Sequence, residues 1–124
     1  MSDTLQHLGT TPVLLCAAEG EPLRGEQDAL DLIGNASYQG AEWAVVPAER
    51  FEDAFFQLHT RVAGDILQKF VNYRVGLAVL GDISRHTDAS GALRDLVRES
   101  NRGTHTWFVT DLDHFGELLA RTAR

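Results

Sequence analysis

Four short apolar runs, separated by longer segments of helical periodicity, most constrain the fold of this chain. The runs occupy residues 13–18, 43–46, 75–80 and 106–109. A short and nearly continuous apolar run is typical of a strand that is covered on both faces, as in parallel sheets. Strands that alternate with helices predict an α/β fold with a mostly parallel sheet. We therefore expect four or five strands and about four helices.

The segments between the runs carry apolar residues at the spacing of amphipathic helices. The pattern predicts a helix over residues 26–38, a long helix over about 51–73, a third helix that ends near 101–103, and a last helix from 111 or 113 onward. Asp88 or Ser90 can cap the third helix, and Gly103 can end it. A brief extra strand is expected at residues 23–24.

At 124 residues, the chain has the length of one domain and can bury a sizeable core. Hydrophobic residues make up 44% and charged residues 23% of the chain, which is the globular range. Residues 1–10 are polar and aperiodic, and we expect them to form a flexible N-terminal arm. Residues 11–124 are then expected to form a single α/β domain.

The acidic balance of the chain limits its possible partners. Asp and Glu number 18 against 11 Lys and Arg, which gives a net charge of -7. Phosphate contacts need clustered basic side chains, so we do not expect nucleic acid as a partner. No apolar run approaches membrane-spanning length, and the N-terminus has no signal-peptide pattern. We therefore expect a cytoplasmic protein with no membrane partner.

Cysteine and histidine chemistry is sparse in this sequence. Cys16 is the only cysteine and lies in an apolar run, which favours an inert buried side chain. The five histidines are scattered and show no zinc-site spacing. The sequence has no glycine-rich phosphate loop and no nucleophile elbow. We expect neither a metal nor a cofactor nor any catalytic residue of a familiar class.

The long helix expected over residues 51–73 carries a polar face beside its apolar stripe. Steps of about 100° per residue place four polar side chains within about a quarter turn, with Lys69 at the margin. These four are Arg61, Asp65, Gln68 and Asn72. The face is either a binding surface or a solvated helix face with an Asp65–Lys69 ion pair. Gly64 indicates a close approach of a backbone or ligand, or tight packing of the helix on the sheet.

Two further pairs of polar residues lie at the ends of expected elements. Asp82 and Ser84 follow the apolar run of residues 75–80. In open α/β sheets ligands bind at the carboxyl ends of strands, so this pair could hold a cation, a proton or a partner. The alternative is a turn in which Asp82 caps its own backbone. Asn101 and Arg102 could also bind a ligand, although a role in capping the third helix is favoured.

Several blocks of the sequence are specific enough to suggest a family. They are AGDILQKF at residues 63–70, NYR at 72–74 and ESNRG at 99–103, together with Gly81, Asp82 and Ser84. These blocks resemble the bacterial domain-of-unknown-function family 4180, and the resemblance extends from about Val13 onward. The family has no established activity, so the resemblance implies a set of polar residues and not a function. Arg61 stands where the family commonly has glycine, and Asp65 where it usually has glutamate.

The order of the expected elements resembles that of the STAS (anti-sigma-factor antagonist) domain. In that group an opening hairpin precedes alternating helices and strands, and a serine in an Asp-Ser-Ser-Gly motif is phosphorylated to switch partner binding. Residues 44–46 match the strand before that motif, and residues 58–61 fall near the switch. The motif itself is absent, and Thr60 is the nearest hydroxyl. The resemblance implies a STAS-like α/β sandwich with a regulatory role.

Three functions are compatible with these observations. The leading hypothesis is a cytoplasmic regulatory or partner-binding domain that binds a protein or a small polar ligand through residues 60–72 and 82–84. The alternative is a small-molecule-binding protein or an enzyme with a pocket at the strand ends. Its site would consist of Asp65, Lys69, Asp82 and Ser84. The third is a homodimer or larger homo-oligomer joined by an exposed edge strand or by Trp43 and Trp107.

Overall fold

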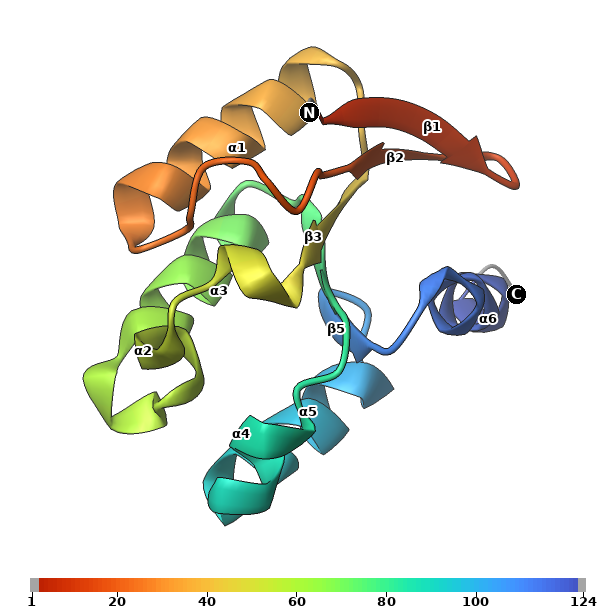
Figure 1. The fold of residues 1–124 in the computed structure, drawn as a ribbon. Coiled ribbons are helices and arrows are strands. Elements are labelled where there is room, and N and C mark those ends of the chain that lie inside the picture. The colour runs from red at the N-terminus through yellow and green to blue at the C-terminus, as the bar shows by residue number, and fades with distance from the viewer. Residues whose placement is uncertain (1–2, 123–124) are drawn as a thin grey trace.

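One five-stranded sheet organises the computed structural model, which describes residues 3–122 (Figure 1). The strands are β1 (Thr4–Leu8), β2 (Thr11–Leu15), β3 (Trp43–Pro47), β4 (Gly76–Leu80) and β5 (Thr106–Val109). They lie in the sheet in the order in which they occur along the chain. β1 is antiparallel to β2, and all other neighbours are parallel. The predicted single-domain α/β fold with a mostly parallel sheet is confirmed.

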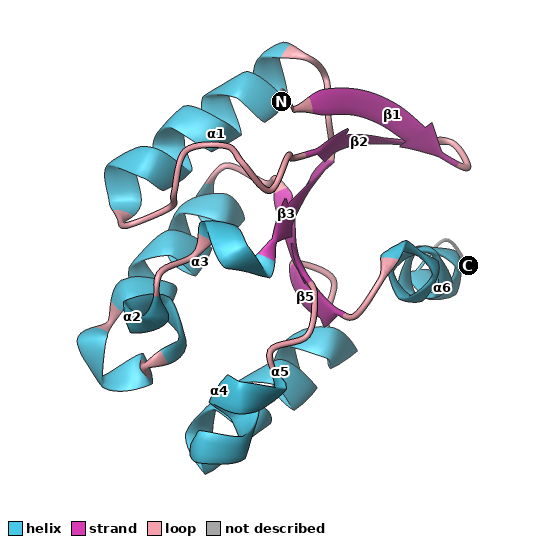
Figure 2. Ribbon diagram, in the orientation of Figure 1, coloured by secondary structure: helices cyan, strands magenta, loops and turns pink. Residues whose placement is uncertain are grey.

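The consecutive strand order places the crossover helices together on one face of the sheet. A parallel crossover is right-handed in nearly all proteins, so repeated crossovers in one direction put their helices on the same side. These helices are α1 (Glu26–Tyr38), α3 (Val62–Asn72) and α5 (Gly91–Arg102). Ile33, Ile66 and Leu93 from the three helices share one core with Leu14 and Leu77 of the sheet. Figure 2 shows the last helix apart from them, across the sheet.

That last helix, α6 (Leu112–Thr122), covers the opposite face together with an aromatic cluster. The rings of Trp43 and Trp107 stack with centroids 4.1 Å apart, and Phe115 meets them at 5.4 and 5.6 Å. Trp43 is 8% exposed and Trp107 is 0% exposed. Both indoles therefore belong to the core, and the hypothesis that they form an oligomer interface is wrong.

Residues 4–8, expected to belong to a flexible arm, form strand β1 instead. The strand pairs with β2 along its whole length, and Gly9 has a φ of 65° in the turn between them. Only Leu5 and Leu8 of β1 are partly buried. An edge strand with so few buried side chains has the polar sequence of a loop, which explains the wrong prediction. Residues 1–2 of the expected arm lie outside the described residues.

The single long helix expected over residues 51–73 is broken into shorter elements. They are α2 (Asp53–Phe56), η2 (Leu58–Thr60) and α3, and a further short element, η1 (Ala48–Arg50), precedes them. Arg61 separates η2 from α3 in a left-handed conformation with a φ of 69°. The Thr60 hydroxyl bonds to the carbonyls of Ala54 at 2.6 Å and Gln57 at 2.8 Å, which holds the turn. Apolar residues keep a helical spacing across this break, so periodicity alone does not reveal it.

The third helix begins at Gly91 with Ser90 as its cap, one of the two predicted starts. The Ser90 hydroxyl accepts a hydrogen bond from the Leu93 N–H at 3.1 Å. A short helix that the sequence analysis did not predict, α4 (Ser84–Ala89), precedes it. The expected strand at residues 23–24 is reduced to one parallel bridge between Leu23 and Phe51.

Within residues 3–122, no helix is both long enough and apolar enough to cross a membrane.

Two glycines on neighbouring elements have opposite surroundings. Gly76 of β4 lies opposite Trp43, and a Cβ at Gly76 would lie 2.4 Å from Trp43 Cδ2. The glycine therefore lets the indole lie directly on the sheet. Gly64 of α3 is exposed, and a Cβ there would meet nothing within 4 Å. Neither the close approach of a backbone nor tight packing on the sheet explains Gly64, so these two interpretations are wrong, and the approach of a ligand stays a prediction.

We predict that Gly76→Ala lowers the free energy of unfolding by about 1–3 kcal/mol, because the new methyl group overpacks the indole. Gly64→Ala is the matched control and should raise this free energy by up to about 1 kcal/mol, because alanine is the better helix former. Urea denaturation of both variants and the parent measures the two changes. A Gly76→Ala variant as stable as the parent would contradict the packing described for Trp43.

Candidate functional site

Two inserted segments meet at the carboxyl edge of the sheet and form the candidate site. After β3 the chain runs through residues 48–61 before α3 begins, and after β4 it runs through residues 81–90 before α5 begins. Each insertion starts at the carboxyl end of a central strand, where α/β sheets commonly bind ligands. The space between them, lined from residues 48–59 and 81–92, is here named the strand-end cleft.

An aromatic stack and an ion pair join the two segments at the centre of the cleft. Phe56 of α2 stacks on His86 of α4 with ring centroids 4.1 Å apart and planes inclined by 13°. Arg85 Nη2 donates to Asp53 Oδ1 at 3.0 Å. Phe56 is buried in the core, whereas Asp53 and Arg85 are exposed. The stack therefore holds the cleft together, and the exposed ion pair adds at most about 1 kcal/mol.

Two half-open cavities of about 550 and 510 Å³ flank this centre. Four residues line both of them, namely Asp53, Phe56, Arg85 and His86. The first cavity also includes His59 and Ser90, and the second includes Glu49 and Asp82. Their size is that of small-ligand pockets, and it equally suits the side chains of a docked protein segment.

Negative charge predominates around the second cavity. Beyond the central ion pair, Arg24 Nε donates to Glu52 Oε2 at 3.0 Å. Glu49 and Asp82 form no ion pair within the part of the chain that the structure describes. Two carboxylates of this cavity are therefore available to a positively charged group.

The protonation states of His86 and Asp82 follow from their surroundings. Burial, and then the nearby charge of Arg85, lower the pKa of His86 below its ordinary value of 6.5. Hydrogen bonds from the Ser84 N–H, at 2.9 Å from Asp82 Oδ1, and from the Ser84 hydroxyl lower the pKa of Asp82. At neutral pH the stacked imidazole is therefore neutral and the Asp82 carboxylate is charged.

A protein-family model described as a domain of unknown function, DUF4180, matches residues 8–119. The chain belongs to the DUF4180 family. This match confirms the family resemblance of the sequence blocks, whereas the STAS-like resemblance stays a prediction. Neither a curated protein nor a solved structure matches the chain.

Among the predicted site residues of this DUF4180 chain, Asp82 lines the strand-end cleft. Its Oδ1 accepts the Ser84 N–H, which is the predicted turn at the start of α4. Asp82 is also exposed and lines the second cavity. Its position therefore fits both interpretations of this residue, the cap of a turn and a side chain that binds a ligand. Ser84 is exposed beside it as the first residue of α4.

The predicted polar face of α3 is separate from the Asp82 cavity, because no α3 residue lines that cavity. Asp65, Gln68 and Asn72 are exposed, and Gln68 Nε2 donates to Asn72 Oδ1 at 2.8 Å. Arg61 is exposed at the break before α3 and not on the helix itself. The structure therefore does not bring the α3 residues and Asp82 together around one cavity.

Thr60 and Lys69 have contacts within the fold. The Thr60 hydroxyl is engaged in its own turn, as described above. Lys69 Nζ lies 3.9 Å from Glu26 Oε1 of α1, and the expected ion pair with Asp65 does not form. Lys69 thus links two helices on the same face of the sheet.

Asn101 closes the outer edge of β5. Its Oδ1 accepts the Phe108 N–H at 2.8 Å, and its Nδ2 donates to the Phe108 carbonyl at 3.0 Å. These are the bonds that a neighbouring strand would otherwise make. Arg102 is exposed with Nη1 3.6 Å from Glu99 Oε2. Neither Asn101 nor Arg102 lines the cavities of the strand-end cleft.

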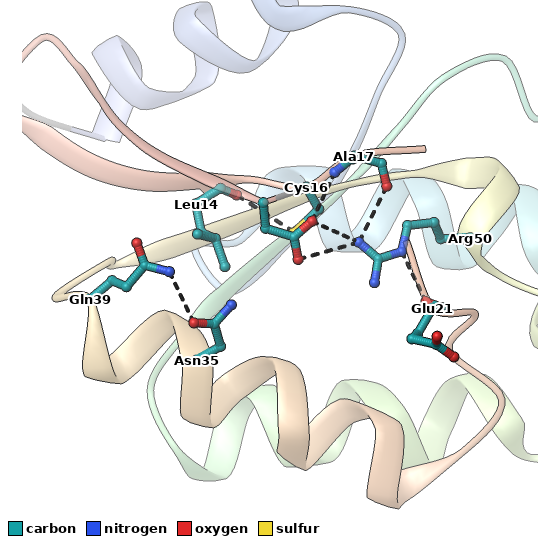
Figure 3. A network of polar contacts seen from close by, with 8 residues as sticks. Leu14, Cys16, Ala17, Glu21, Asn35, Gln39 and Arg50 are labelled. Atoms are coloured by element: carbon teal, nitrogen blue, oxygen red, sulfur yellow. Dashed lines mark hydrogen bonds and ion pairs between the residues drawn. The ribbon is translucent and has the colours of Figure 1, made fainter. Parts of the chain in front are cut away.

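Arg50 is a buried polar residue that the sequence analysis missed. It is 6% exposed and follows β3 in η1. Figure 3 shows its guanidinium group among the carbonyls of the loop after β2, where Nε donates to Glu21 at 3.0 Å and Nη1 to Ala17 at 3.3 Å. Nη1 also lies 3.3 Å from Asp3 Oδ1, which accepts the Ala17 N–H at 3.0 Å. One arginine therefore fixes the N-terminal segment, this loop and the end of β3.

Gly20 is the sequence position at which this network requires a particular residue type. A Cβ at Gly20 would lie 2.5 Å from Arg50 Cζ, so the close approach of the guanidinium group requires glycine. From the sequence, Gly20 is part of a turn after an apolar run. A turn glycine does not indicate which side chain will lie against it.

Cys16 lies beside the Arg50 network (Figure 3). Burial, and then the negative charge of Asp3, raise the pKa of the Cys16 thiol to about 12. Such a thiol stays protonated and unreactive at neutral pH, in agreement with the predicted inert side chain. Within residues 3–122 no group of three or more His, Cys, Asp or Glu residues is placed to hold a metal ion.

We predict that Asp3→Asn lowers the free energy of unfolding by about 3 kcal/mol, because Arg50 keeps its buried charge without a counter-ion. Adding Arg50→Met removes that charge, so the double variant should lose less than the sum of the two single losses. The expected coupling is about 1–3 kcal/mol in a double-mutant cycle measured by chemical denaturation. Strictly additive losses would show that the ion pair does not stabilise the fold.

Because the pKa of His86 is lowered on folding, the unfolded chain binds more protons below pH 6.5. The contribution of His86 to stability is therefore complete above pH 6.5 and decreases as the pH falls below this value. We predict that NMR titration gives a His86 pKa below 6.5. His86→Gln should reduce the loss of unfolding free energy between about pH 7.5 and about pH 5. A pKa above 6.5 would contradict the buried stack.

Proposed function

We propose that this DUF4180 chain is a cytoplasmic, STAS-like regulatory domain that binds a segment of another protein at the strand-end cleft. The observation that carries this function is the meeting of two inserted segments, joined by the Phe56–His86 stack, at the carboxyl edge of the sheet. Strands and helices in α/β domains are commonly connected by about 2–6 residues. Both insertions are longer than such a connection requires, and their exposed residues are free to recognise a partner.

The charge of the cleft favours a basic segment as the partner. A lysine or arginine side chain in the second cavity would meet the carboxylates of Glu49 and Asp82 and lie against Phe51 and Phe56. The net charge of -7 would also attract a basic partner over longer distances.

The STAS-like resemblance supports binding near the start of the helix that follows β3. Residues 58–61 fall near the switch position of that group, although its motif is absent, and Leu58 and His59 line the first cavity. Phosphorylation of Thr60 would remove its hydrogen bonds to Ala54 and Gln57, which hold the break before α3. We therefore propose recognition at this region without modification of Thr60. Arg61 adjoins this region at the break before α3, whereas Asp65, Gln68 and Asn72 line neither cavity and lie outside the proposed binding site.

A small polar molecule in the cleft is the second candidate, favoured by the cavity volumes of about 550 and 510 Å³. A catalytic site built from Asp65, Lys69, Asp82 and Ser84 has less support, because the two pairs do not line one cavity.

Photo-crosslinking in the native cells, followed by binding measurements with the purified partner, tests the proposed function. A photoreactive amino acid in place of His59 or Glu49 should give a covalent adduct with one protein, and the same residue in place of the exposed Ser37 on α1 should not. Glu49→Gln combined with Asp82→Asn should then lower the affinity for that partner by at least about tenfold. Glu117→Gln with Asp113→Asn on α6 is the matched control and should leave it unchanged.

Equal adducts from the cleft positions and from Ser37, or an unchanged affinity of the cleft variant, would contradict the proposed function. Protection of the cleft by a compound of low mass, without any protein adduct, would support the second candidate instead.

A further inference from the structure

The chain closes one edge of its sheet with its own side chains. Asn101 bonds to both the N–H and the carbonyl of Phe108 on the outer side of β5. Arg121 Nη2 of α6 donates to the Asn101 carbonyl at 2.6 Å, which holds the closing residue in place. Unpaired edges attract strands of other chains, and side chains that cover an edge prevent such pairing.

Within the described residues, the opposite edge strand, β1, has no bulge, no proline and no charged side chain to prevent pairing. Its register with β2 is regular from Thr4 to Leu8, without a bulge. Its sequence TLQHL contains no proline and no charged residue, in a chain of which 23% of the residues are charged. The sheet ends at β1, so alternate backbone groups of residues 5–8 face outward. This regular, uncharged edge can pair with a further strand.

An apolar groove adjoins the same edge. It has a volume of about 960 Å³, lies between the β1–β2 turn and α6, and includes Leu8, Leu112 and Leu119. Leu112 is 40% exposed. Because Leu8 belongs to both β1 and the groove, a chain that pairs with β1 comes to lie beside apolar surface that it can cover.

We propose that a second copy of this chain pairs with β1 in antiparallel orientation about a two-fold axis, so that the two sheets continue as one. An antiparallel strand is self-complementary under a two-fold axis, and a register centred on Gln6 places Leu5 opposite the partner's His7. A copy of the chain fits because two molecules with a net charge of -7 each can approach most easily at an uncharged edge. The pairing strands are short, so the interface is small and the dimer forms only at high concentration.

Sedimentation equilibrium from about 10 μM to about 1 mM tests this proposal. The average mass should rise from 13.7 kDa toward twice that value as the concentration increases. Gln6→Lys places two like charges at the two-fold axis and should raise the dimer dissociation constant by at least about tenfold. Ser37→Lys, with the same charge change on exposed α1, should leave the dissociation constant unchanged. Melting temperatures of both variants verify that they fold.

Dilution of the unsubstituted protein, followed by NMR, provides a second measurement that needs no variant. The amide signals of residues 5–8 should shift with concentration, and those of residues 106–109 should not. A mass of 13.7 kDa throughout the range would overturn the proposal, as would a dimer that Gln6→Lys leaves intact. Concentration-dependent shifts confined to other residues, or a foreign strand on β1 of a chain that stays monomeric, would overturn it equally.

Discussion

The consecutive order of four parallel strands is the constraint on which the rest of this structure depends. With right-handed crossovers, this order commits α1, α3 and α5 to one face of the sheet. The second face is then left to α6, which is too small to cover it alone. Trp43 and Trp107 complete the cover, and Gly76 allows the Trp43 ring to lie on the strand below it. The strand order thus explains why two large aromatic side chains, Trp43 and Trp107, lie on this face of the sheet.

The same constraint bears on the proposed binding site. In doubly wound sheets a crevice opens where neighbouring crossovers leave toward opposite faces. The crossovers after β3 and β4 leave toward the same face, so added segments must build any recognition surface there. In the proposed function residues 48–60 and 81–90 do so, and Arg50 anchors the start of the first segment to the loop after β2. A surface of this kind is half-open, which suits a protein segment better than a ligand that must be enclosed.

The sequence predicts the part of the fold that depends on burial. Fully covered strands and amphipathic helices have periodic apolar patterns, so β2 to β5, α1, α5 and α6 were all expected. Prediction from the sequence fails where tertiary contacts determine the local structure. The break at Arg61 interrupts a helix whose apolar spacing continues, and β1 is too exposed to show a strand pattern. Arg50 is a single basic residue, and only the folded chain shows that two carbonyls and Asp3 surround it.

The candidate site was predictable to a similar extent. Asp82 follows a buried strand, and that position alone identified the carboxyl edge of the sheet. Phe56 and His86 have no such signal, because their stack joins two insertions from distant parts of the sequence. Helical spacing groups Arg61 with Asp65, Gln68 and Asn72, but the break before α3 separates Arg61 from that helix.

Hydrogen–deuterium exchange of the chain, free and in complex with the protein captured through the cleft, tests the central claim most directly. We expect slower exchange in residues 48–60 and 81–92 of the complex, with no change in β5 or α6. Slower exchange confined to the α3 face, or to elements on the far side of the sheet, would contradict the assignment of the strand-end cleft as the recognition surface.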